Sequence, residues 1–218
     1  MNESGPSVPD CWPPSQPPSA LAPVPLFPLP NVFLFPGTLM PLHIFEPRYR
    51  QMIEDSLDGP GRLVVAAVLE EFHDELSGAP PVYPVAGLGE IARHERLPDG
   101  RFVIMLFGLA RVKIRELPSD RPYRQVEAAP LQEVPPADLE AERLRPKLLR
   151  AVLQRTPELL NLPDEMPLGH LADLLLLRMA LPQSAMQDLY SRLSIVDRAR
   201  RALAEHSRRP LPPPEPPG

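Results

Sequence analysis

The chain has 218 residues, and 34 of them are proline, about three times the usual proportion. Eleven prolines lie in residues 1–36 and six in the last nine, so the folded part is expected between about 25 and 208. A hydrophobic fraction of 43%, a charged fraction of 23% and a net charge of −5 indicate a globular protein. They exclude collagen, a coiled coil and bulk disorder, and the net charge argues against a protein whose main task is to grip polyanions. The single cysteine, Cys11, excludes a disulfide framework within one chain and favours a reducing, cytoplasmic setting.

The two ends are expected to be disordered. Residues 1–23 and 209–218 are rich in proline and poor in large apolar side chains, so they bury too little surface to offset the entropy of ordering. The start has no basic region followed by an unbroken apolar run, which argues against a secretory signal. The longest apolar stretches are far shorter than the ~20 residues that a bilayer span needs.

Residues 24–134 have the pattern of an antiparallel β unit, in which short apolar runs are separated by the turn-forming residues Gly, Pro and Asp. The expected strands are 31–35, 39–45, 63–69, 101–107, 109–117 and 123–131. A helix is expected over 47–57, because Pro47 suits a first turn and Gly59-Pro60 ends the run. Strands this short are best satisfied by closing into a small barrel, since an open sheet leaves edges to protect.

Three glycines punctuate these strands. Pro36-Gly37 and Asp99-Gly100 are interpreted as turn formers rather than ligand contacts, with each glycine supplying a positive φ. Gly108 separates the two expected strands 101–107 and 109–117.

The clearest alternation falls in 109–117, where Ala110, Val112 and Ile114 are expected to face inward. The three cations Arg111, Lys113 and Arg115 would then lie on the opposite, solvent-facing side of the strand. This is a weak signal for RNA, because the surrounding half is acidic and no aromatic residues interleave the cations.

In residues 135–208 the apolar period changes to that of helices, and three to five of them are expected. Pro146 either kinks a long helix that begins near 137 or starts a second one. A buried helix is expected over 171–181. Two further helices are expected to open on capping boxes, Ser184 with Gln187 and Ser194 with Asp197.

The usual catalytic constellations are missing from the sequence. There is no phosphate-binding loop, no serine nucleophile motif, and no pair of histidines at metal-ligand spacing. The sequence therefore predicts no catalytic residues, no metal site and no cofactor. A hydrolase using His43 and Glu46 stays a third alternative, although a packed histidine beside a capping glutamate is the simpler interpretation.

From Pro25 to Leu42 the sequence PLFPLPNVFLFPGTLMPL resembles the opening of the N-terminal, substrate-binding domain of Lon-type ATP-dependent proteases. The similarity continues through HIFEPRY at 43–49, LPDGR at 97–101 and GLARVKI at 108–114. In the helical half it continues through LAD at 171–173 and VDR at 196–198. The resemblance implies an α+β fold: a small antiparallel PUA-like β-barrel over 24–134, then a helical bundle over 135–208.

The resemblance also implies a function. This chain is expected to end before the ATPase and Ser-Lys peptidase modules of the full-length proteases, so we expect no enzyme. We expect a polypeptide-binding module, with unfolded or degron-bearing chains, and a protease or chaperone, as partners in protein quality control. RNA or small-ligand binding by the barrel is the alternative; the composition disfavours nucleic acid, and nothing in the sequence indicates a membrane or fixes the oligomeric state.

A reader of apolar peptides needs exposed hydrophobic surface. The richest source is the stretch 33–45, and the candidate peptide-binding residues are Phe33, Phe35, Met40, Leu42 and Phe45. Phe35 and Met40 are the first choices for exposed members. If the stretch proves to be core, the binding surface is expected along a groove between barrel and bundle.

Overall fold

The structure is a computed structural model that describes residues 23–75, 78–156, 162–163 and 165–211. The expected tails fall mostly on residues 1–22 and 212–218, which lie outside the described residues. The chain divides into two compact units. Of the described residues, the first comprises those within 23–28, 34–66 and 86–130, and the second comprises those within 29–33, 67–85 and 131–211. The second unit thus includes two segments from within the stretch expected to form the barrel.

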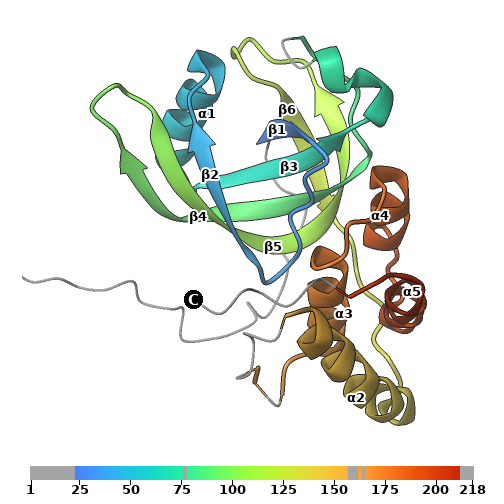
Figure 1. Ribbon diagram of the computed structural model, residues 1–218. Helices are drawn as coiled ribbons and strands as arrows, with labels where there is room; N and C mark the ends of the chain where they lie inside the picture. The colour runs from blue at the N-terminus through green and yellow to red at the C-terminus, as the bar shows by residue number, and fades with distance from the viewer. Residues whose placement is uncertain (1–22, 76–77, 157–161, 164, 212–218) are drawn as a thin grey trace, which may run out of the picture. The chain divides into compact units, whose positions relative to one another are not determined.

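Six strands form one sheet: β1 (Val24–Pro30), β2 (Leu39–Ile44), β3 (Arg62–Val68), β4 (Val85–Arg96), β5 (Phe102–Leu117) and β6 (Gln125–Pro130). Their order is β2-β5-β4-β3-β1-β6, and β6 also pairs with β5. This second pairing closes five of the strands into a ring, which Figure 1 shows as a curved wall of arrows. The expected α+β class is confirmed, and β2 is attached outside the ring of five strands. The pairs β1–β6, β2–β5, β3–β4 and β5–β6 are antiparallel.

The long strand β5 pairs with β2 along its first half and with β6 along its second half. Residues 102–107 pair with β2, from Ile44↔Phe102 to Leu39↔Phe107, while residues 112–117 pair with β6. The two strands expected at 101–107 and 109–117 are therefore one strand. Gly108 lies between its halves because a side chain there has no room: a Cβ would be 2.0 Å from the backbone oxygen of Phe35.

The expected strand at 31–35 is wrong, because the first strand is β1, Val24–Pro30. Three prolines in this run argue against a strand in sequence terms. Here Pro25 is paired with Gln125 at the start of the strand, and Leu26 donates its N–H to Arg124 O at 2.8 Å. Asn31 then leaves the strand with φ 52°, a left-handed conformation that asparagine tolerates.

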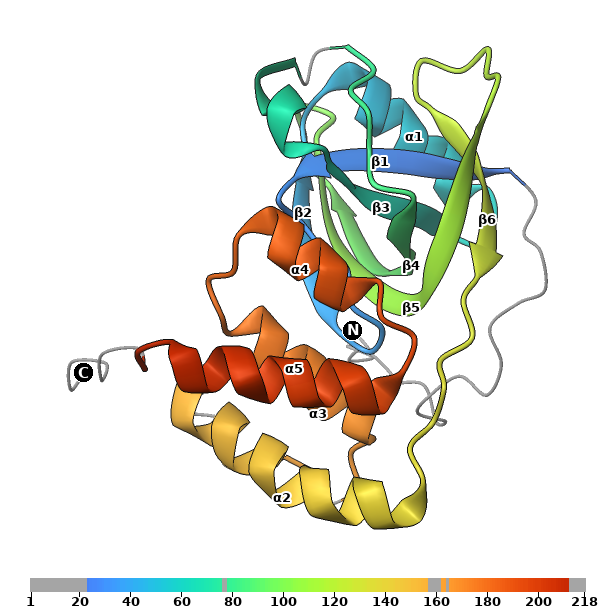
Figure 2. The same cartoon turned by 90° about the vertical axis from the view of Figure 1, so that its right-hand side faces the viewer.

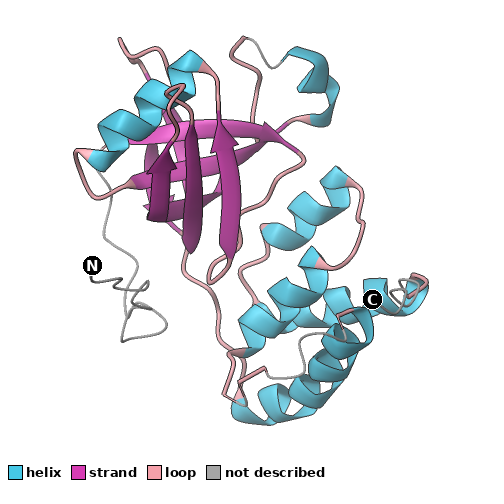
Figure 3. Cartoon of the chain, turned by 60° about the vertical axis from the view of Figure 1, so that its left-hand side comes forward, coloured by secondary structure: helices cyan, strands magenta, loops and turns pink. Residues whose placement is uncertain are grey.

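The helix α1 (Pro47–Leu57) has the bounds that the sequence predicts, with proline in its first turn. Its buried residues are Tyr49, Met52, Ile53 and Ser56. The Tyr49 ring lies 4.6 Å from the ring of Phe27 on β1, so the helix packs against the sheet (Figure 3).

The second unit contains α2 (Asp138–Arg155), α3 (Leu168–Leu177), α4 (Gln183–Tyr190) and α5 (Ile195–Arg208). The helices α2, α3 and α5 contact one another in pairs, as Figure 2 shows. Pro146 lies within α2, so one long helix forms rather than two. The expected cap at Ser194 is confirmed, since its side chain accepts a hydrogen bond from Asp197 N. The expected cap at Ser184 is wrong, because α4 begins after Pro182 and Ser184 is inside the helix.

A buried ion pair joins α3 to α5. Arg198 is fully buried, and its Nε lies 2.9 Å from Oδ1 of Asp173, which is 2% exposed. The same guanidinium contacts Glu133 Oε1 at 2.6 Å and donates to the backbone oxygen of Arg192 at 2.6 Å. The arginine thus satisfies a carboxylate in the bundle interior that would otherwise be costly to bury.

The helix α4 is hydrogen-bonded to both ends of the segment 67–85, which belongs to the second unit. Its Gln183 donates a side-chain hydrogen bond to Val68 O, and Gln187 donates one to Val85 O at 3.1 Å. These bonds explain why residues 67–85, which contain a short 3-10 helix at Glu70–Glu75, belong to the helical unit. Among the helices that the structure describes, none is long and apolar enough to cross a membrane.

Candidate binding surface

The pairing of β2 with β5 turns alternate side chains of β2 to opposite faces of the sheet. Met40 and Leu42 are half-buried and stand opposite the buried residues Leu106 and Ile104. Leu39, Pro41 and His43 are exposed, as is Phe45 one step beyond the strand. Side chains two residues apart share a face, so these four residues form one outward row.

Apolar side chains of β5 extend this row across the sheet. Residues directly opposite in an antiparallel pair share a face, which places Phe107, Met105 and Val103 beside Leu39, Pro41 and His43. We call the six apolar residues together the outer face: Leu39, Pro41, Phe45, Val103, Met105 and Phe107. Phe45 is 62% exposed, Leu39 60% and Val103 41%. These are large fractions for apolar side chains of a folded unit.

The structure separates the residues that the sequence proposed as peptide-binding. The expected exposure of Phe35 is wrong: the side chain is fully buried, and the guanidinium of Arg111 lies 5.5 Å from its ring centroid. Phe33 belongs to the second unit, where its ring lies 5.6 Å from that of Tyr190. Met40 and Leu42 lie on the inward side of β2. Phe45 remains on the exposed row.

Sequence reasoning missed Leu39 and Val103 as members of the surface. The signal that finds them is the alternation along 39–45, which places Leu39 and Phe45 on the same face. Val103 can be assigned to this surface only when the register between β2 and β5 is known. It stands opposite His43, which lies about 60 residues earlier in the chain.

The residues interpreted as turn formers have the expected geometry. Gly37 follows Pro36 with φ 77°, and Gly100 follows Asp99 with φ 81°, both in the left-handed region that favours glycine. Asp99 accepts a hydrogen bond from the backbone N–H of Arg101 at 3.1 Å, which lowers the pKa of its carboxyl group. These contacts are local to the turn.

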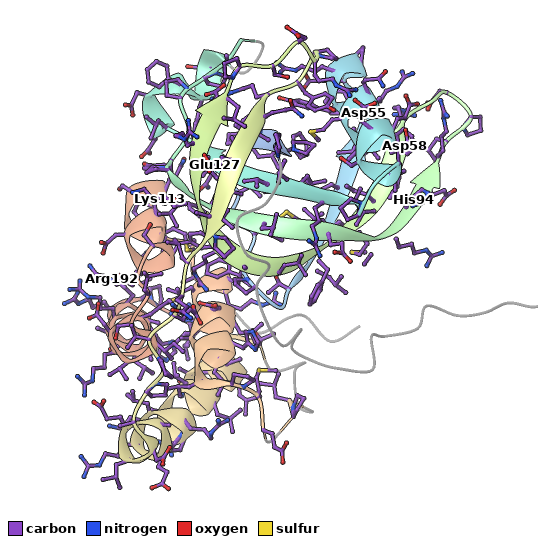
Figure 4. The ribbon with its side chains drawn as sticks, turned by 180° about the vertical axis from the view of Figure 1, so that it is seen from behind. Asp55, Asp58, His94, Lys113, Glu127 and Arg192 are labelled. Carbon is purple, nitrogen blue, oxygen red and sulfur yellow. The ribbon has the colours of Figure 1, made fainter. Side chains whose placement is uncertain are left out.

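A cleft of about 260 Å³ opens elsewhere on the first unit, lined by Asp55, Arg62, Arg121, Tyr123 and Gln125 together with apolar groups that include Pro23 and Pro60. Tyr123 donates its hydroxyl to Asp55 Oδ2 at 2.6 Å, and Arg121 also pairs with this oxygen. The hydrogen bond from Tyr123 lowers the pKa of Asp55. Burial, followed by the bond to Asp55, raises the pKa of Tyr123 to about 12. Figure 4 shows Asp55 and Asp58 at the end of α1.

The expected row of three cations on 109–117 is wrong at Arg111, which is buried. Arg111 and Val112 are both buried although they are adjacent, so the strand departs from simple alternation here. Arg115 pairs with Glu127 on β6, and Lys113 is exposed (Figure 4). These residues form no cationic, aromatic-bearing face.

The structure does not assemble a catalytic pair from His43 and Glu46. His43 is exposed with its ring 6.2 Å from that of Phe45, while Glu46 Oε2 accepts a hydrogen bond from Arg48 Nε at 3.0 Å. Within the described residues, no hydrogen bond joins the two side chains, and no group of three or more His, Cys, Asp or Glu could hold a metal ion.

The fold is thus an α+β module, in which a ring of strands carries the exposed apolar side chains of β2 and β5 and is followed by a helical unit. The sequence profile of the family described as "ATP-dependent protease La (LON) substrate-binding domain" matches residues 23–205. The chain belongs to this family, which confirms the resemblance noted from its motifs.

Curated relatives and solved structures agree with this assignment. The Lon protease of Desulfovibrio desulfuricans is 26% identical over 80% of this chain and 21% of its own length. That of Trichlorobacter lovleyi is 29% identical over 82% of this chain and 22% of its own. The chain thus spans about a fifth of the length of these proteases.

Two solved structures share the fold. The N-terminal domain of the Mycobacterium avium complex Lon protease has a TM-score of 0.64 and 20% identity, covering 85% of this chain and 98% of that one. A Lon N-terminal domain protein from Xanthomonas campestris has a TM-score of 0.58 and 21% identity, covering 84% and 98%.

Proposed function

We propose that this chain is a non-enzymatic module that binds apolar segments of unfolded or degron-bearing polypeptides on the outer face. The observation that carries the proposal is the row of exposed apolar side chains on β2 and β5, with Leu39 and Phe45 each more than half exposed. A folded unit that exposes neighbouring apolar groups of this size is suited to binding a partner there.

Membership in the substrate-binding family supports the same conclusion, because the family description names substrate binding. The proposed place of the chain is in protein quality control, in the cytoplasm, where a protease or chaperone would receive the bound polypeptide. Binding of RNA gains no support, since Arg111 is buried and Arg115 is paired with Glu127.

The test is binding of a permanently unfolded, fluorescein-labelled casein, followed by anisotropy. Leu39→Thr combined with Phe45→Thr removes two large apolar side chains of the surface that are each more than half exposed. Half-burial of each on binding accounts for about 1 kcal/mol, about 2 kcal/mol for the pair, so the double variant should bind roughly thirtyfold more weakly.

The matched control is Leu139→Gln, which removes a leucine that is 67% exposed on α2, in the other unit. Its affinity should stay within about twofold of the parent chain. Circular dichroism must be the same for all three proteins. Equal casein binding by the double variant and the parent would refute the outer face as the binding surface.

A further inference from the structure

The strand β2 presents an open backbone edge. It is an end strand of the sheet, with β5 as its only neighbour in the strand order. Gly108 N–H donates to Thr38 O at 2.9 Å, which places Thr38 at a position bonded to β5. Backbone groups alternate between the two sides of a strand, so those of Leu39, Pro41 and His43 point away from β5. In the described part of the chain, no hydrogen bond uses these outward groups.

The position of Pro41 supports the conclusion that the backbone groups of residues 39, 41 and 43 point away from β5. Proline has no N–H, and within sheets it is confined to positions where a ladder hydrogen bond is not needed. At 41 it occupies an outward position, so the pairing with β5 loses nothing. The open edge therefore offers two N–H donors, from Leu39 and His43, and three carbonyl acceptors.

We propose that the polypeptide bound by this chain adds to β2 as an extended strand, an inference that rests on the proposed function. An alternating row of N–H and C=O groups carries alternating partial charges, and an extended peptide backbone supplies the complementary row at the same spacing. The added strand runs antiparallel, which is the more stable pairing. Its ligand class is a segment of alternating apolar and polar residues.

The geometry fixes which residues of the bound segment matter. In an antiparallel pair, residues that exchange hydrogen bonds stand opposite each other with their side chains on one face. The residues of the ligand that bond to Leu39 and His43 therefore turn their side chains onto the side of the outer face. The same alternate residues supply the apolar contact and the backbone hydrogen bonds.

The probe is a fluorescein-labelled nine-residue peptide of alternating valine and threonine, in three forms: unmodified, N-methylated at the valines, and N-methylated at the threonines. N-methylation removes a donor and blocks one edge of a strand. Valine methylation should weaken binding at least tenfold, because it removes the donors that face β2, whereas threonine methylation should weaken it less than threefold.

A matched pair of protein variants tests the same edge from the other side. His43→Pro removes one of the two outward N–H groups, whereas His43→Thr keeps the N–H and removes only the imidazole. We expect His43→Pro to bind the unmodified peptide about fivefold more weakly and His43→Thr to bind it within twofold, with unchanged circular dichroism for both.

The outcomes separate the two proposals. Failure of the unmodified peptide to bind at all would count against the proposed function itself. Binding that is weakened equally, or not at all, by the two methylations would overturn strand addition and leave the proposed function standing. The reverse selectivity would keep strand addition but refute the antiparallel direction. A dimer of the chain alone that His43→Pro dissociates, seen by sedimentation, would make a second copy the occupant and overturn the peptide.

Discussion

Removing the guanidinium of Arg198 should destabilise the helical unit strongly. Arg198→Ala leaves the Asp173 carboxylate, 2% exposed, without its 2.9 Å ion pair to Nε. Breaking a buried ion pair from one side costs about 3–5 kcal/mol, because an uncompensated charge stays in the interior. The control is Arg201→Ala, which removes an exposed pair to Asp197 and should cost less than about 1 kcal/mol.

The assay is urea unfolding of the full chain, followed by the helical circular-dichroism signal, with the slope of the transition compared between variants. A second variant replaces both partners, Arg198→Met with Asp173→Leu. It should recover most of the loss, since it buries no unpaired charge between α3 and α5. A loss below about 1 kcal/mol for Arg198→Ala would refute the argument, because the carboxylate would then have another way to be satisfied.

Four further predictions concern two glycines and two titratable groups. Gly108→Ala should destabilise the sheet by at least about 2 kcal/mol, because its Cβ would meet a backbone oxygen. Gly37→Val should destabilise it by about 1–3 kcal/mol, because valine is strained at positive φ. Thermal unfolding measures both losses of stability. Burial, followed by the nearby charge of Arg155, lowers the pKa of His206, so its contribution to stability is complete above the usual pKa of 6.5 and falls as the pH drops below it. His206→Gln should flatten that slope in urea titrations between pH 5 and about 7.5. Tyr123→Phe should raise the pKa of Asp55 in a carboxyl-detected NMR titration, and an unchanged pKa would show that the hydrogen bond is not its main cause.

The sequence identifies features that local chemistry determines. The bounds of α1, the cap at Ser194 and the positive φ of Gly37 all follow from residues within one turn of the position concerned. The fold class follows from the strand punctuation together with the family motifs.

The failures involve distant partners. Phe35 looks like any aromatic residue of an apolar stretch, and its burial depends on segments about 75 residues further along the chain, near Gly108 and Arg111. The strand β1 is hard to predict because its prolines argue against a strand. The pairing with β6 that accommodates Pro25 is not visible in the sequence. Of the outer face, the sequence candidates include only Phe45, since which side of β2 is covered depends on its pairing with β5. Its members on β5 lie outside the stretch 33–45.

Closure of the ring has a consequence for how the chain is made. Val24 at the start of β1 pairs with Val126 on β6, about a hundred residues later. During synthesis β1 emerges first, yet its partner on this side leaves the ribosome last among the strands. The local hairpin of β5 with β6 pays a much smaller loop-closure entropy, so it forms before the ring is sealed. Until then the apolar residues of β1 remain without this cover, which makes the nascent chain itself a ligand of the kind that quality-control proteins bind.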